Sequence, residues 1–162
     1  MPERARPSEQ VLFSGIYGLV LASIVSAALD APGEASDPGS DALWVLLTAV
    51  TAAAAHGYAH VIAQRATGGG AAGTGRLRSV LAEWPLVAAV LPTLVLMLTS
   101  LAGWWSEAAA VETALLLNTV ALFGCGTWAA RTAGRGLAAS CRSGSMDMVI
   151  GLVVIGANAV IK

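Results

Sequence analysis

Two histidines, His56 and His60, are the residues whose type and spacing point most directly to chemistry. They stand four positions apart near the basic end of a stretch, 42–63, that contains no Asp, Glu, Lys or Arg. Residues four apart lie on one face of a helix, so both imidazoles are expected to face the same way. Ionisable groups within an apolar segment usually face a bundle interior or a wet cavity and mark an ion or proton path. Because imidazole is a good ligand for zinc, iron, nickel or copper, His56 and His60 are the candidate metal ligands.

The composition places these histidines in an integral membrane protein. The 162 residues are 56% hydrophobic and only 12% charged, with a mean hydropathy of +0.71, whereas soluble domains carry about 25% charged residues. The apolar residues occur in runs, and about 20 of them suffice to cross a hydrocarbon core of roughly 30 Å. We therefore predict an all-α integral membrane protein, a single transmembrane domain over 1–162 built as a five-transmembrane-helix bundle. The spans are expected at about 11–29, 42–63, 80–104, 111–130 and 146–161, the last being short.

The distribution of charge orients the predicted bundle. Eight of the nine basic residues fall in or beside the amino-terminal stretch and the connections after the second and fourth spans. Most acidic residues fall in the other two connections, so the positive-inside rule predicts a cytoplasmic amino terminus. The glycine-rich stretch 64–79 is expected to be a flexible cytoplasmic linker, since it lacks the lysine that a phosphate-binding loop requires. The predicted location is the cell membrane, as a multi-pass protein.

Four further polar residues are candidates for lining a path beside the histidines. Tyr17 in the first span, Glu83 at the start of the third and Asp147 near the start of the fifth lie at similar depth near the cytoplasmic face. Asn118 lies inside the fourth span. Structural interpretations remain open, because carboxylates at helix starts favour the positive end of the helix dipole. Tyrosine, asparagine and histidine also form hydrogen bonds between helices in membrane bundles.

The first span carries small residues at a spacing that favours close helix contact. Ser14, Gly18 and Ala22 form a small-xxx-small face, which predicts tight packing within the bundle or dimerisation. Pro92 lies within the third span and is expected to kink that helix or to free a carbonyl. Because small bundles of this length seldom enclose a path alone, we expect a homodimer or a higher homo-oligomer in the lipid bilayer.

Two classes of function are excluded by the pattern. Zinc proteases use HExxH, and here Gly57 stands where that motif has its general base, so no enzyme is predicted. Nucleic-acid binding needs a continuous basic surface, and these arginines are spread over separate short connections. No resident cofactor is predicted, and a divalent transition metal is considered only as a substrate.

The segment GYAHVIAQR at 57–65, which follows a first span of the form LFSGIYGLVLAS, resembles the vacuolar iron transporter family. In that family the first helix carries a GxxDGLV-like element and the second ends in a GEYVSV-x-SQR-like element. The resemblance implies five spans, an inside amino terminus and a cytoplasmic segment between spans two and three. Tyr17 stands where the family has aspartate, and Gly57 stands where it has glutamate. The sequence TGGGAAGTG replaces the family's acidic, metal-gathering helices, so His56 and His60 would have to take over the role of those carboxylates.

The resulting hypothesis is a small membrane transporter that moves a divalent transition metal through a histidine-containing path. One alternative is a non-transporting membrane scaffold or assembly protein, in which the same histidines only form hydrogen bonds between helices. Another is a proton or monovalent-ion channel, because histidine titrates near physiological pH.

Overall fold

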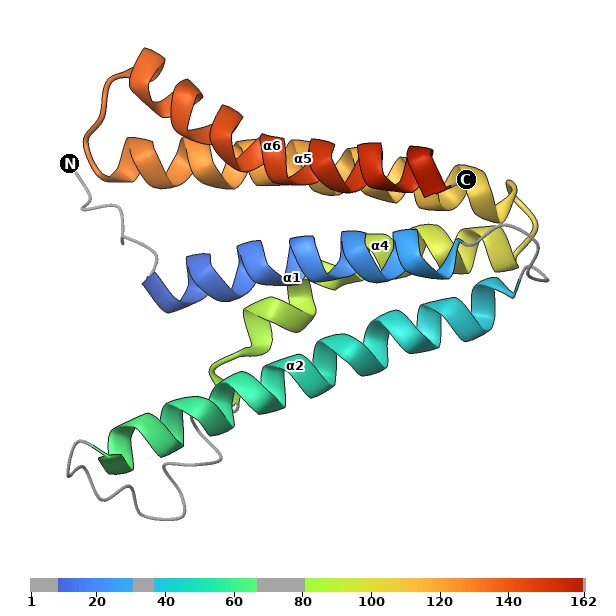
Figure 1. Ribbon diagram of the computed structural model, residues 1–162, viewed down its shortest axis with the longest axis horizontal. Coiled ribbons are helices and arrows are strands. Elements are labelled where there is room, and N and C mark those ends of the chain that lie inside the picture. The colour runs from blue at the N-terminus through green and yellow to red at the C-terminus, as the bar shows by residue number, and fades with distance from the viewer. Residues whose placement is uncertain (1–8, 31–36, 67–80, 162) are drawn as a thin grey trace.

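The computed structural model describes residues 9–30, 37–66 and 81–161, and over these ranges the secondary structure is helical, with no strand. The predicted all-α fold is therefore confirmed for the described residues. Most of the predicted linker 64–79 lies outside them. The helices are α1 (Glu9–Leu29), α2 (Pro38–Ala66), α4 (Trp84–Leu101), α5 (Glu107–Thr132) and α6 (Leu137–Ile161), arranged as an elongated bundle (Figure 1).

These five helices are each long and apolar enough to cross a membrane. The fifth helix is longer than the short span predicted to begin at Met146. α6 begins at Leu137 and runs for 25 residues, or about 37 Å at 1.5 Å per residue. The reason is that α5 ends in a tight turn at Gly134, whose φ of 81° is readily adopted only by a residue without a side chain. The chain therefore reverses early, and most of the basic stretch that follows belongs to α6.

The third predicted span is also shorter than expected. α4 begins at Trp84 with Pro85 in its first turn, where the missing amide hydrogen costs no helical hydrogen bond. It ends at Leu101, followed by Gly103 with a φ of 79°, so Trp104 lies in the turn and not in the helix. The Ser106 side chain then accepts a hydrogen bond from the backbone of α5's first turn.

The bundle is apolar outside and partly polar inside. Large side chains such as Leu43, Val153 and Val160 are exposed, as they are in proteins whose solvent is lipid. Within the described ranges ten polar or charged residues are buried instead. Helix contacts in membranes use such residues as hydrogen-bonding partners. The ten residues are Ser14, Ser23, Ser26, Glu83, Thr93, Ser100, Asn118, Thr119, Ser140 and Asn158.

Small residues set the closest helix contacts. Gly18 of α1 lies against the backbone of α4, where a Cβ atom would collide with the carbonyl oxygen of Leu86. Ser14 and Ala22, on the same face, are buried too. The predicted small-residue face therefore packs within the chain, and it is not available for a contact with a second copy.

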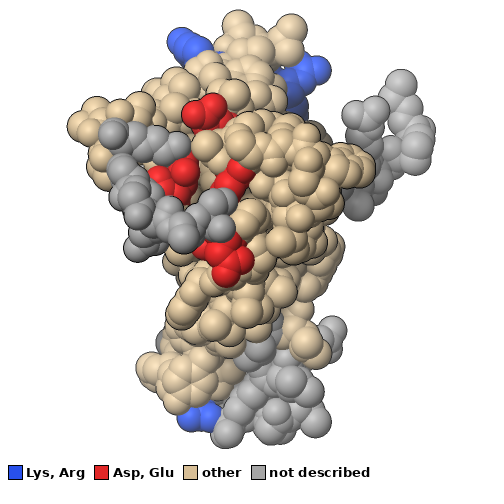
Figure 2. Space-filling view, turned by 90° about the vertical axis from the view of Figure 1, so that its right-hand side faces the viewer, with Lys and Arg blue, Asp and Glu red and all other residues tan. Residues whose placement is uncertain are grey.

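The two ends of the bundle differ in charge. α1 and α6 begin, and α2 and α5 end, at the left of Figure 1, where the described basic residues Arg65, Arg131, Arg135 and Arg142 lie. Acidic side chains gather on the opposite end, including Asp41 in the first turn of α2 and Glu107 in the first turn of α5 (Figure 2). The structure thus keeps the charge segregation on which the predicted orientation rests.

Replacing Gly18 by alanine should destabilise the bundle by about 1–3 kcal/mol, because the added methyl group meets backbone and not a flexible side chain. Gly15→Ala is the matched control on the same helix, since nothing lies within 4 Å of the position that its methyl group would take. Thermal unfolding in detergent should give a lower Tm for Gly18→Ala and an unchanged or higher Tm for Gly15→Ala. Equal Tm values for the two variants would contradict the α1–α4 contact.

Candidate functional site

Glu83 is a carboxylate buried where α4 begins. It occupies the position before the first helical residue, Trp84, yet its side chain makes no capping hydrogen bond to the helix. Only 1% of its surface is exposed. Glu83 thus stands at the start of α4, as predicted, but its side chain is buried in the bundle and does not cap the helix.

Two donors from α1 hold this carboxylate. The Ser14 hydroxyl donates to Glu83 Oε2 at 2.5 Å, and the Gln10 amide donates to Oε1 at 2.9 Å. Gln10 and Ser14 are four residues apart, so one face of α1 presents both groups. A buried carboxylate requires such partners, because an unpaired one would lose its hydration without compensation. The sequence prediction missed both residues as partners of Glu83, because their spacing does not show which face of α1 packs on α4.

His60 of α2 lies on the outer side of this carboxylate. Its Nε2 atom is 3.7 Å from Glu83 Oε1, and its side chain is 53% exposed. That separation is too long for a direct hydrogen bond, but it is close to the separation of two ligands of one metal ion. The pair therefore connects the protein surface to a buried negative group.

His56 has different neighbours, one turn away on α2. Its ring centroid lies 4.8 Å from that of Tyr17 and 5.6 Å from that of Phe13. The tilted ring contacts are those of an aromatic cluster between α1 and α2. The structure thus brings His56 to Tyr17 and His60 to Glu83. Within the described residues, no three His, Cys, Asp or Glu side chains are grouped to hold a metal ion.

Asn118 lies apart from this site, in the interior of the bundle. Its amide donates to Ser23 Oγ of α1 at 3.2 Å and to Thr93 Oγ1 of α4 at 3.0 Å. The residue is fully buried, so it joins α1, α4 and α5 through neutral polar groups. This geometry favours the structural interpretation of Asn118 over the path-lining one.

Asp147 is also placed away from the histidines. Because α6 begins at Leu137, Asp147 stands well inside the helix, and the interpretation of it as a helix-start residue is wrong. Its carboxylate lies against Gly126 of α5, where a Cβ atom would collide with it. Of the candidates, the structure pairs His56 with Tyr17 and His60 with Glu83. It leaves Asn118 and Asp147 in two other contacts.

Replacing Asn118 by leucine should lower stability by about 0.6–1.7 kcal/mol, the range for hydrogen bonds between helices in membranes. Thr113→Val is a matched control on α5, because the Thr113 hydroxyl donates only to a carbonyl of its own helix. Thermal or denaturant unfolding in detergent would measure both. An Asn118→Leu protein as stable as Thr113→Val would show that the three-helix network contributes nothing.

Comparison with known proteins does not assign this chain to a family. No protein-family model matches the chain, and no curated protein or solved structure is significantly similar to it. Its function must therefore be argued from the arrangement of Glu83, His60 and their neighbours.

Proposed function

We propose that this chain is a small multi-pass membrane transporter in which Glu83 and His60 bind a divalent transition metal in transit. The proposal places the amino terminus and this pair on the cytoplasmic side. One observation carries it: a carboxylate that is 1% exposed has an exposed imidazole 3.7 Å away. Ionisable groups at the ends of membrane helices, held by protein partners, are characteristic of ion paths.

A purely structural link between α1 and α4 does not need a charge. Asn118 already joins these two helices to α5 with an amide and hydroxyl groups. A carboxylate in the same setting costs several kcal/mol more in lost hydration unless a positive partner compensates. The imidazolium form of His60 or a metal cation beside it would supply that compensation. This contrast favours a role in cation handling for Glu83.

The chemistry of the pair suits a transition metal. Imidazole nitrogen and carboxylate oxygen are both ligands of zinc, iron and manganese. Two such ligands, each about 2.1 Å from a zinc ion, are separated by roughly 3.4 Å at a tetrahedral angle. The observed 3.7 Å therefore requires only a small side-chain adjustment. Two protein ligands completed by water bind weakly, and an ion in transit must also leave its site.

The next polar groups along the proposed path are His56 and Tyr17. His56 lies one turn of α2 from His60, about 6 Å along the helix axis, and contacts the ring of Tyr17. In the proposal His60 and Glu83 receive the ion and His56 is a subsequent ligand after its ring rotates. A homo-oligomer remains part of the proposal, formed through a face other than the one occupied by Gly18.

A membrane scaffold is the second candidate. The hydrogen bonds from Ser14 and Gln10 to Glu83 tie α1 to the start of α4, which is a structural role in itself. A scaffold needs the hydrogen bonds but not the negative charge, whereas a transporter needs the charge. The variant Glu83→Gln, which keeps hydrogen-bonding atoms but loses the negative charge, therefore distinguishes a scaffold from a transporter.

Metal flux into proteoliposomes tests the proposal. Wild type, Glu83→Gln, His60→Gln and the control Glu9→Gln would be compared with iron, manganese, zinc and cobalt. Glu9 is exposed in the first turn of α1, so its substitution makes the same charge change outside the site. We expect Glu83→Gln and His60→Gln to lower the flux at least tenfold, because each removes one of two protein ligands.

Folding must be shown to be intact in the same samples. Equal Tm values and equal reconstitution for all four proteins would assign the loss to ligand chemistry. Wild-type flux no greater than that of empty liposomes, or full flux with glutamine at position 83, would sink the transport proposal and favour the scaffold.

His56→Phe tests separately whether His56 is a ligand along the proposed path. Phenylalanine preserves ring contacts with Phe13 and Tyr17 but has no ligand atom, so the Tm should stay near that of the wild type. We expect flux to fall by a smaller factor than in His60→Gln, because His56 has no carboxylate beside it. A flux equal to that of the wild type would remove His56 from the path.

A further inference from the structure

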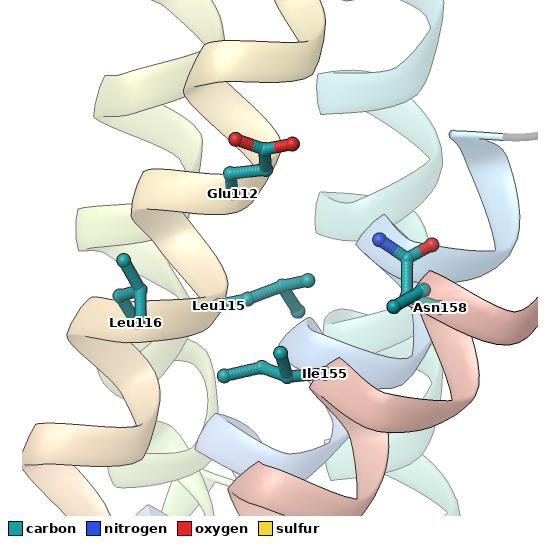
Figure 3. Close-up of a pocket in the computed structure, with 6 residues that line it drawn as sticks. Glu112, Leu115, Leu116, Ile155 and Asn158 are labelled. Atoms are coloured by element: carbon teal, nitrogen blue, oxygen red, sulfur yellow. The ribbon is translucent and has the colours of Figure 1, made fainter. Parts of the chain in front are cut away.

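A groove of about 390 Å³ lies between α5 and α6, at the acidic end of the bundle and far along the chain from Glu83. Its volume is within the range of about 300–1,000 Å³ that is typical of small-ligand sites. Figure 3 shows Glu112 and Leu116 on the α5 wall and Ile155 and Asn158 on the α6 wall. The lining residues are Glu112, Leu115, Leu116, Ile155, Asn158 and Ala159.

The groove holds an amide without a partner. Asn158 is only 8% exposed, and no hydrogen bond joins its side chain to any residue over the described ranges. Because Asn158 lines the groove, its amide can reach a group that enters there. The other interior asparagine, Asn118, has two acceptors for its amide. Asn158 therefore points to a polar group supplied by a ligand.

Polarity changes along the groove in a definite order. Glu112 lies close to the start of α5 and Asn158 close to the end of α6, so both are near the same end of the bundle. Leu115, Leu116 and Ile155 lie about one turn further in (Figure 3). A ligand that fits this order has a polar head at the membrane surface and an apolar chain beneath it.

The charge at this end selects the head group. Glu112 is exposed, and acidic side chains gather on this end of the bundle (Figure 2). Among the described residues, the arginines all lie at the other end. A carboxylate on one wall of the groove and a free amide on the other favour an ammonium group, which offers both a positive charge and N–H donors. An anionic head group would meet a repulsive field.

We propose that this groove binds a phospholipid with a primary ammonium head group, of the phosphatidylethanolamine type. Glu112 pairs with the ammonium group, Asn158 forms hydrogen bonds with the head group or glycerol esters, and the leucine and isoleucine side chains receive an acyl chain. The inference depends on membrane insertion, which the metal-transport proposal shares. It does not depend on transport itself.

Lipid retention measured by native mass spectrometry tests the assignment. The protein would be released from nanodiscs that contain equal amounts of phosphatidylethanolamine, phosphatidylcholine and phosphatidylglycerol with identical acyl chains. Phosphatidylcholine keeps the positive charge but has no N–H donor. We expect about fivefold preferential retention of phosphatidylethanolamine, which corresponds to about 1 kcal/mol.

Three variants locate the binding. Glu112→Gln removes the negative charge from the groove, and Ala159→Trp fills the groove from its exposed edge. In each variant the retention of phosphatidylethanolamine relative to the other two lipids should fall close to one. Glu107→Gln, at the same end but outside the groove, should keep the wild-type ratio. A wild-type protein without preference among the three lipids would overturn the proposal. A preference for phosphatidylethanolamine that persists in both Glu112→Gln and Ala159→Trp would also overturn it. If Ala159→Trp dissociates a dimer and leaves lipid retention unchanged, the groove is an interface between two copies of the chain, and the proposal is likewise overturned.

Discussion

The burial of Glu83 is the constraint on which the rest of this structure depends. A carboxylate removed from water must find donors within the protein, and Ser14 and Gln10 supply them from α1. Those bonds require α1 to lie close against the start of α4, and the contact between Gly18 and the Leu86 carbonyl allows that approach. His60 then reaches the same carboxylate from α2. One charged group thus determines how three helices meet at one end.

Other buried polar groups of the bundle also need hydrogen-bond partners, and they differ in whether the protein supplies them. Asn118 satisfies its amide within the protein and carries no charge, so it serves as a link between helices. Asn158 is nearly as deeply buried but has no partner over the described residues, and it faces a groove. Glu83 has partners and an exposed histidine beside it. The hydrogen bonds and neighbours of these three residues distinguish a structural contact, a proposed lipid-binding groove and a candidate ion site.

The sequence was sufficient to predict the five apolar helices and the segregation of charge, because both depend on composition along the chain. It was also sufficient to place His60 and Glu83 at similar depth. Helix ends were less predictable: α6 extends back to Leu137 because Gly134 turns the chain early, a backbone property that hydropathy does not report. The partners of Glu83 required knowledge of helix rotation. Gln10 and Ser14 can reach the carboxylate only when one face of α1 packs on α4, and spacing alone does not choose that face.

The central claim is that Glu83 carries a charge that serves a cation and not only a helix contact. Infrared difference spectroscopy of the reconstituted protein, with and without zinc or manganese, reports this directly through carboxylate stretching bands. We predict a metal-induced band shift that disappears in Glu83→Gln and weakens in His60→Gln, while Glu9→Gln retains it. A metal-induced spectrum that is the same in Glu83→Gln and in the wild type would contradict the account and leave Glu83 as a purely structural residue.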